Sequence, residues 1–214
     1  MQTITLMNLE FNINNKNIGK DMMQHAEKHN LLTLEQYGER KHHRSIIAAL
    51  NKRLMMDLLR LRQQTRALCS NDAKYCYDRI VHSFASIAMR RLGAHPQAVT
   101  SMLSALQTAI YHIITAFGTS DTHFGQEQYP PLQGLGQGNG AACWALISTP
   151  LINMMKTAGF GLLLFSAITA TLLHFVCYAF VDDTDVVHCS SLTATAQEII
   201  TEMQEVVDHW EGGL

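Results

Sequence analysis

Apolar side chains follow helical spacing most clearly over residues 43–62. Six of them form one stripe: Ile46, Ile47, Leu50, Leu54, Leu58 and Leu61. This stripe predicts an amphipathic helix that buries these six residues and carries its arginines on the opposite face. Similar patterns predict helices over residues 21–32, 76–92, 96–117, 141–157 and 193–210. The asparagine-rich residues 12–17 are expected to form a loop.

Three short runs have the composition of strands. Residues 65–71 are short and lack a helical stripe, and residues 175–181 are apolar, aromatic and β-branched. Residues 185–189 follow as a further strand after a turn at residues 182–184. The last two strands therefore form a predicted hairpin, and the glycine-rich residues 118–140 form a predicted loop.

Residues 159–181 also allow a different interpretation. This stretch has no Lys, Arg, Asp or Glu, and its length and apolarity meet the criterion for a membrane-spanning helix. Its aromatic and β-branched end and its acidic C-terminal flank favour a buried strand instead. A single-span membrane protein crossing at 159–181 remains an alternative on sequence grounds.

Composition narrows the class of protein. The 214 residues are 47% hydrophobic and 16% charged with a net charge of −2. The length suits one globular domain, or one and a part, and the composition disfavours a disordered chain. Five cysteines without a C-x-x-C pair disfavour a disulfide framework and a structural zinc site. The N-terminus has no secretory signal pattern, so an intracellular protein, cytoplasmic or nuclear and not secreted, is expected.

Charge is distributed unevenly along the chain. Residues 40–66 contain eight basic side chains and one acid, whereas no Lys or Arg follows Lys156 and eight acids lie between Asp182 and the end. A polyanion bound by the basic segment and cations bound by the acidic segment would explain this asymmetry. Two solvated helix faces of opposite sign are the simpler explanation.

Carboxylates stand at the ends of two predicted strands. Asp72 follows the strand at 65–71, and Asp182 and Asp183 occupy the tip of the predicted hairpin. If both strands belong to one sheet, three carboxylates converge, and oxygen ligands suit Mg²⁺ in phosphoryl transfer. Taken alone, each site is more typical of a turn or a helix N-cap than of a metal site.

A glycine-rich loop is the third candidate element. Gly134, Gly136, Gly138 and Gly140 surround Gln137 and precede a helix, so the backbone can approach a substrate closely. The pattern fits neither a dinucleotide-binding fingerprint nor a phosphate-binding loop of the Gly-Lys-Ser/Thr type. A flexible surface loop is an equally good interpretation of the glycines alone.

In this order, the three elements resemble a reverse transcriptase of the non-LTR retrotransposon and group II intron type. Residues 72–80 are similar to the first palm motif of that family, Gln137-Gly138 to its Gln-Gly loop, and residues 178–183 to its aromatic-x-Asp-Asp hairpin. Residues 37–45 resemble a fingers segment in which a glycine and basic residues precede a helix. The resemblance covers residues 35–190.

The resemblance implies roles for particular residues. Asp72, Asp182 and Asp183 match catalytic carboxylates that bind two Mg²⁺ ions, with Mn²⁺ as a substitute. Tyr77 matches the aromatic residue beneath the incoming sugar that excludes a 2′-hydroxyl. The positions that match substrate-binding segments are Gln137 and Gly138 in the Gln-Gly loop and Arg40, Lys41 and Arg44 in the fingers.

The resemblance also implies a fold and partners. The expected fold is α+β, a polymerase palm whose antiparallel sheet packs on helices, with partial helical fingers over residues 1–66, a palm over 67–214 and no thumb. Such a protein transfers deoxynucleoside triphosphates to the 3′-hydroxyl of a DNA or RNA primer on an RNA template, without stable membrane association. Because the thumb motifs are not found, this part is expected to be weak or inactive as a polymerase alone. An inactive mobile-element remnant with the same fold is the other alternative.

Overall fold

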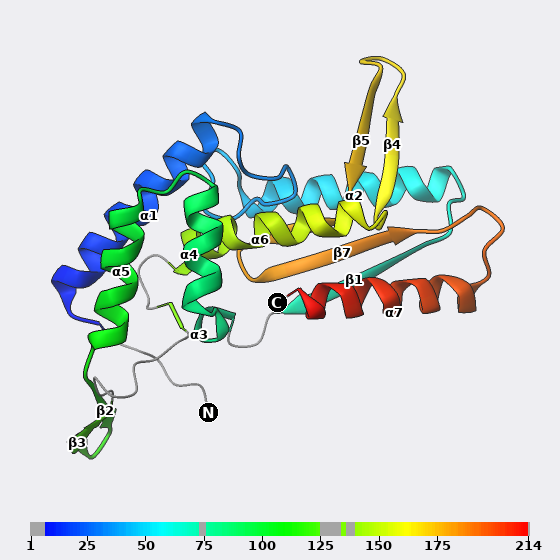
Figure 1. Cartoon of the computed structure of the whole chain (residues 1–214). Coiled ribbons are helices and arrows are strands. Elements are labelled where there is room, and N and C mark those ends of the chain that lie inside the picture. Colours follow the sequence, from blue (N-terminus) through cyan, green and yellow to red (C-terminus); the bar gives the residue numbers. More distant parts are fainter. Residues whose placement is uncertain (1–6, 73–75, 125–133, 136–139, 214) are drawn as a thin grey trace.

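The computed structural model describes residues 7–72, 76–124, 134–135 and 140–213 (Figure 1). Its central element is a three-stranded antiparallel sheet with the order β1-β7-β6. The strands are β1 (Arg66–Asp72), β6 (Cys177–Phe180) and β7 (Asp183–Cys189). These are the three predicted strands, with bounds that differ by at most two residues.

Helices cover both faces of this sheet. Helix α2 (Ser45–Leu61) lies on one face, and helices α6 (Gly140–Thr157) and α7 (Ala196–Gly212) lie on the other. Successive side chains of β7 point to opposite faces, because Val186 packs with α6 and α7 whereas Val187 packs with α2. The observed class is therefore α+β, as predicted.

Helix α7 begins with a local sequence signal. The Thr195 hydroxyl accepts a hydrogen bond from the Glu198 amide, and the Glu198 carboxylate accepts one from the Thr195 amide. This capping box satisfies amide groups that a helix leaves free at its N-terminus. The hydrogen bonds that the Thr195 amide and hydroxyl donate to the Glu198 carboxylate lower the pKa of that carboxyl.

A second core surrounds the N-terminal half of α6. Helices α1 (Leu9–Lys28), α4 (His82–Arg91) and α5 (Pro96–Thr108) gather there, on the left in Figure 1, and the short α3 (Cys76–Arg79) links β1 to them. The buried side chains of this core include Met23, Met89, Met102 and Trp144. Helix α6 therefore connects the helical cluster with the sheet.

The predicted inward face of α2 is wrong. Ile46, Leu50, Leu54 and Leu61 are each more than half exposed, and the side chains buried against the sheet are those of Met55 and Leu59. The helix is rotated because partners on the sheet decide which side faces inward. Its Lys52 meets Asp185 of β7, and Asn51 donates a hydrogen bond to the Tyr37 hydroxyl.

Two predicted boundaries are also wrong. Residues 12–17 belong to α1, where the Asn15 side chain is completely buried, so packing overrides the low helix propensity of asparagine. The helix expected to reach residue 117 ends at Thr108. Strands β2 (Tyr111–Thr115) and β3 (Gly118–Phe124) follow as a hairpin. Isoleucines and Tyr111 favour the strand conformation there.

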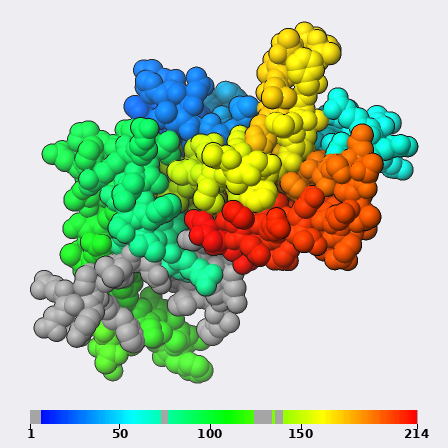
Figure 2. Space-filling view, turned by 45° about the vertical axis from the view of Figure 1, so that its right-hand side comes forward, coloured from blue at the N-terminus to red at the C-terminus, as the bar shows by residue number. Residues whose placement is uncertain are grey.

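Residues 159–181 are not one helix. They form a hairpin of β4 (Leu162–Ser166) and β5 (Thr171–Phe175), followed by β6. The hairpin projects from the body of the molecule at the top of Figures 1 and 2. No helix within the described ranges has the length and apolarity needed to cross a membrane.

Candidate functional site

Two of the predicted carboxylates lie directly opposite each other. Asp72 ends β1 and Asp183 begins β7, and the two residues are register partners in the antiparallel pair. Partners of this kind point to the same face of a sheet, with Cβ atoms about 4.5–5.5 Å apart. Asp182 immediately precedes Asp183 in the two-residue turn that links β6 to β7. The fold therefore brings together the three acids at one end of the sheet.

The face that carries Asp72 and Asp183 also carries a neutralised carboxylate. Asp185 follows two positions along β7, and its Oδ2 atom lies 2.5 Å from Lys52 Nζ. The Ser70 hydroxyl donates a hydrogen bond to Oδ1 of the same carboxylate. Sequence analysis did not identify these residues, although the two-residue spacing from Asp183 indicates a shared face.

Asp72 and Asp183 have no such cation in the described part of the chain. Their side chains are exposed, that of Asp182 is half-buried, and no ion pair between described residues includes any of the three. Opposed like charges destabilise a strand pair, and a hard divalent cation is the partner that carboxylate oxygens favour. The donor set fits Mg²⁺, although the described residues contain no group of three side chains already arranged around a metal position.

Tyr77 lies between the end of the sheet and the start of α6. Its backbone oxygen accepts a hydrogen bond from the Leu135 amide at 2.7 Å. A Cβ atom added to Gly140 would lie 3.2 Å from the Tyr77 ring, so this aromatic side chain packs against the first turn of α6. Gln137 and Gly138 lie outside the described residues.

The chain just before the Gln-Gly segment is anchored from α3 and α4. The Gly134 amide donates a hydrogen bond to the Ile80 oxygen at 2.9 Å, and the Gly134 oxygen lies 2.7 Å from Nε2 of His82. His82 is buried, with Gln107 on its other ring nitrogen. The structure therefore assigns this histidine a structural contact that the sequence did not indicate.

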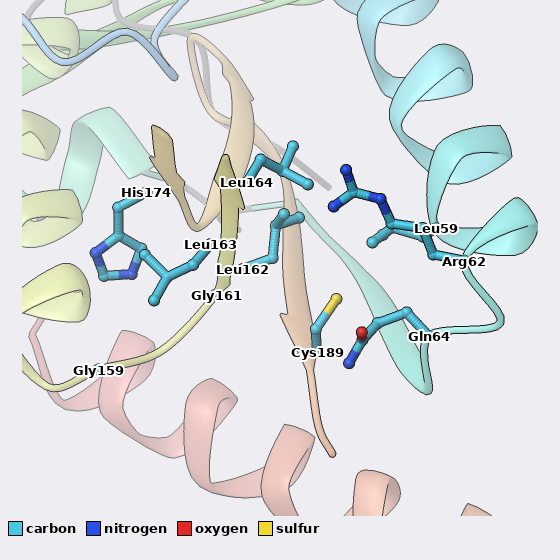
Figure 3. Close-up of a pocket in the computed structure, with 10 residues that line it drawn as sticks. All are labelled: Leu59, Arg62, Gln64, Gly159, Gly161, Leu162, Leu163, Leu164, His174 and Cys189. Atoms are coloured by element: carbon cyan, nitrogen blue, oxygen red, sulfur yellow. The ribbon is translucent and has the colours of Figure 1, made fainter. Parts of the chain in front are cut away.

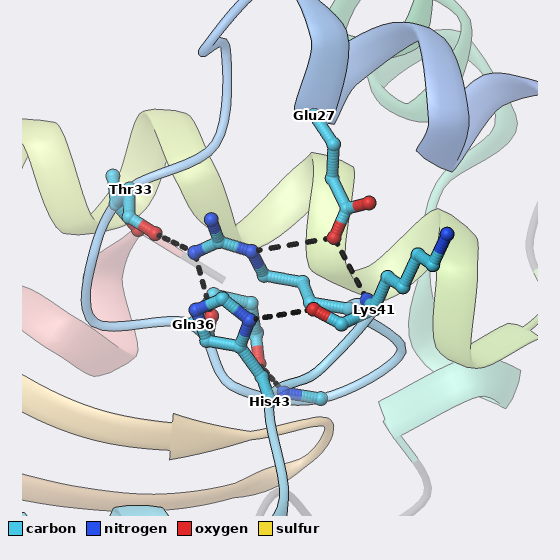
Figure 4. A network of polar contacts seen from close by, with 7 residues as sticks. Glu27, Thr33, Gln36, Lys41 and His43 are labelled. Carbon is cyan, nitrogen blue, oxygen red and sulfur yellow. Dashed lines mark hydrogen bonds and ion pairs between the residues drawn. The ribbon is translucent and has the colours of Figure 1, made fainter.

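The three basic candidates of the fingers segment differ in their surroundings. Arg40 is largely buried, and its Nη1 donates hydrogen bonds to the oxygens of Thr33 at 2.9 Å and Gln36 at 3.0 Å (Figure 4). The side chains of Lys41 and Arg44 are exposed. The guanidinium of Arg40 is thus committed to the protein, whereas the other two cations face solvent.

A groove of about 950 Å³ lies beside Arg40 and Lys41. It is lined by α1, the loop at residues 39–43 and the start of α6. Lys16 and Lys20 of α1 add two cations that sequence analysis missed, and the acids in the lining are Glu27 and Glu39. A groove with this excess of positive charge suits a polyanion.

A second cavity, of about 290 Å³, lies at the other end of the sheet (Figure 3). Its lining includes Cys189, the last residue of β7, together with Arg62, Gln64 and the base of the β4–β5 hairpin at Leu162. The carboxylates lie at the opposite end of β7, so this cavity is separate from the candidate site.

Comparison with known proteins supports the fold alone. No protein-family profile matches the chain, and no curated protein matches it. The solved structures similar to it include the telomerase of Candida albicans in complex with the TWJ fragment of telomeric RNA, with a TM-score of 0.56 at 11% identity. The corresponding telomerase of Candida tropicalis gives a TM-score of 0.52, also at 11% identity.

The extent of the match is asymmetric. Both alignments cover 90% of this chain but only 32% and 31% of the telomerase chains. The chain therefore spans about a third of the length of the structures it matches. The chain therefore shares the fold of the matched part of these telomerase chains.

Proposed function

We propose that this chain is the palm and partial fingers of an RNA-directed DNA polymerase of the non-LTR retrotransposon and group II intron type. The observation that carries the proposal is the register of β1 and β7, which places Asp72 opposite Asp183 beside Asp182. Carboxylates on adjacent strands at one sheet end suit nucleotidyl transfer to a primer 3′-hydroxyl.

Asp72, Asp182 and Asp183 are the residues that would hold two Mg²⁺ ions, or Mn²⁺ in their place. When bound, such ions supply the positive charge that stabilises the attacking and leaving oxygens. The protein's own contribution is positioning: the strands fix the carboxylates, and Tyr77 next to Gly140 closes the space beneath the sugar. Steric exclusion by that ring would reject a 2′-hydroxyl.

The groove beside α1 is proposed to bind the nucleic acid. Lys16, Lys20, Lys41 and the nearby Arg44 offer cations to a phosphate backbone. Gln137 and Gly138 are proposed to line the nucleotide pocket. Arg40 would act there indirectly, because its hydrogen bonds to the backbone oxygens of Thr33 and Gln36 hold the segment that precedes Lys41. The expected partners are an RNA template, a DNA or RNA primer and deoxynucleoside triphosphates.

Single-nucleotide incorporation tests the proposal without requiring processive movement. The purified chain is incubated with an annealed RNA template and DNA primer, one matching deoxynucleotide and Mg²⁺, beside Asp182→Asn and an Asp121→Asn control. Asp121 is exposed on β3, outside the candidate site. Incorporation that Asp182→Asn abolishes and Asp121→Asn preserves is expected. Mn²⁺ affinity, measured by electron paramagnetic resonance, should fall in Asp182→Asn and stay unchanged in Asp121→Asn.

Equal incorporation by the parent chain and Asp182→Asn, together with equal Mn²⁺ affinity, would contradict the proposed function.

A further inference from the structure

Residues 35–38, here named the strap, lie along the edge of the sheet at β6. The backbone oxygen of Glu35 accepts a hydrogen bond from the Ala179 amide at 2.9 Å, and the Tyr37 amide donates one to the backbone oxygen of Ala179 at 2.7 Å. These bonds form a short parallel bridge to an edge strand that would otherwise expose its backbone. The strap therefore ends next to the turn that carries the carboxylates.

The side chain of Gln36 connects the strap to that turn. It is completely buried, and its Nε2 donates a hydrogen bond to the Ser148 hydroxyl of α6 at 3.2 Å. Its Oε1 accepts two amide hydrogen bonds, from Gly38 at 3.0 Å and from Val181 at 3.3 Å. One amide group thus ties together a helix, the strap and the residue that precedes Asp182.

Val181 has a backbone conformation that its side chain disfavours. Phe180 and Asp183 are register partners, so Val181 and Asp182 form a two-residue hairpin turn, and of these two only Val181 has a positive φ, at 58°. A positive φ at the first turn position alone is the type II′ pattern, where glycine is usual. A β-branched residue there is strained and persists only when its surroundings hold it.

The approach between strap and turn is close enough to require glycine. A Cβ atom at Gly38 would lie 2.5 Å from Val181 Cγ2, which is closer than real side chains come. Arg40 also holds the strap, because its Nη1 donates a hydrogen bond to the backbone oxygen of Gln36 at 3.0 Å (Figure 4). The contact between Gln36 and Val181 is therefore part of a rigid arrangement.

We propose that Gln36 is a positioning residue that holds Val181 in its strained conformation and thereby aims Asp182 and Asp183 toward the side of Asp72. The metal-binding part of this inference rests on the proposed function; the effect on the turn does not. Gln36 does not touch substrate in this role and acts through the turn.

The test uses the full chain with four variants. Gln36→Met keeps the length of the side chain and removes its hydrogen bonds. Val181→Gly supplies a residue that adopts a positive φ without support, and it is made alone and with Gln36→Met. Gln64→Met is the matched control, because the Gln64 side chain donates to the Ser190 oxygen at the far end of the same sheet.

Two readouts separate positioning from general stability. The first is hydrogen exchange of the amides of residues 181–183, which needs no metal. The second is the affinity for Mn²⁺ measured by electron paramagnetic resonance. Gln36→Met should accelerate exchange at Val181 and weaken Mn²⁺ binding about tenfold, the scale expected for one lost buried hydrogen bond and released strain. Gln64→Met should change neither.

Rescue provides the strongest evidence. In the Gln36→Met background, Val181→Gly should restore most of the Mn²⁺ affinity, because glycine favours the turn on its own. If Gln36→Met does not fold, Ser148→Ala removes only the acceptor of Nε2 and should give smaller changes of the same sign. Unchanged exchange at residues 181–183 in the Gln36 or Ser148 variant, or no rescue by Val181→Gly, would overturn the inference.

The proposed function fails separately. If the parent chain binds Mn²⁺ no better than Asp182→Asn, the proposed chemistry is wrong, and the exchange data alone still decide whether Gln36 holds the turn.

Discussion

Lys156 Nζ of α6 lies 2.6 Å from Oε1 of Glu35, a side chain with no exposed surface. The other carboxylate oxygen, Oε2, is buried and has no hydrogen-bond partner among the described residues. This ion pair joins the strap to α6, as does the hydrogen bond between the neighbouring Gln36 and Ser148. The Lys156 ammonium group offsets the free-energy cost of burying the Glu35 carboxylate.

Replacing Lys156 by methionine should destabilise the fold by about 2–3 kcal/mol. Removal of one partner leaves a buried charge unpaired, and the value stays below the upper range because Lys156 is one-quarter exposed. Urea unfolding measures the loss, with Lys28→Met on exposed α1 surface as the control. The double variant Glu35→Leu/Lys156→Met should recover more than half of it; a double variant less stable than Lys156→Met would contradict the explanation.

Asp183→Asn should raise the thermal midpoint of the metal-free chain and remove its response to Mg²⁺. The reason is that directly opposed like charges destabilise a strand pair, by up to about 1 kcal/mol. Thermal unfolding with and without Mg²⁺ measures both effects, beside Asp121→Asn. A metal response that survives in Asp183→Asn would remove this carboxylate from the site.

Tyr77→Ala should relax discrimination between deoxynucleotides and ribonucleotides. The ring packs against Gly140 at the start of α6, and its loss opens space beneath the proposed sugar position. Single-nucleotide incorporation of both substrates, compared with Tyr77→Phe, measures the change. The same preference in the alanine and phenylalanine variants would show that the ring does not exclude the 2′-hydroxyl.

The stability of the chain should fall above pH 9, partly because of Cys143. Burial raises the pKa of this thiol from 9.0 to about 12, so the unfolded chain loses the proton before the native protein does. The free energy of unfolding then decreases by up to about 1.4 kcal/mol per pH unit between those values and is unaffected below pH 9. Cys143→Val should give a shallower decline in urea unfolding at pH 8–11. Identical slopes would exclude the thiol as a cause.

The β4–β5 hairpin should promote self-association. Phe165 and Leu172 are register partners and each is about 60% exposed, in a hairpin that has no charged residue. The pair Phe165→Glu and Leu172→Lys places opposite charges across the strands and should reduce the sedimentation-measured association without lowering the thermal midpoint. Thr169→Lys at the tip is the control for added charge. Association that persists in the double variant would contradict this prediction and favour the exposed face of α2 as the surface that associates.

Local sequence determined those parts of the molecule whose structure depends on near neighbours. Short runs without a helical stripe, or rich in apolar and β-branched residues, predicted the three sheet strands, and a helical stripe predicted α2. The acids were placed correctly at the strand ends. The capping box of Thr195 and Glu198 likewise depends on residues three positions apart.

Only the tertiary structure decided which of these elements meet. The register that sets Asp72 opposite Asp183 joins strands more than a hundred residues apart. The rotation of α2 follows from the packing of Met55 and Leu59 against Tyr178 and Val187 of the sheet. Residues 159–181 have a composition that suits either a membrane helix or strands. In the structure they form strands, because β4 pairs with β5 and β6 pairs with β7. The periodicity of a segment indicates which of its residues can share an apolar face. The surface against which that face packs depends on residues distant in the chain.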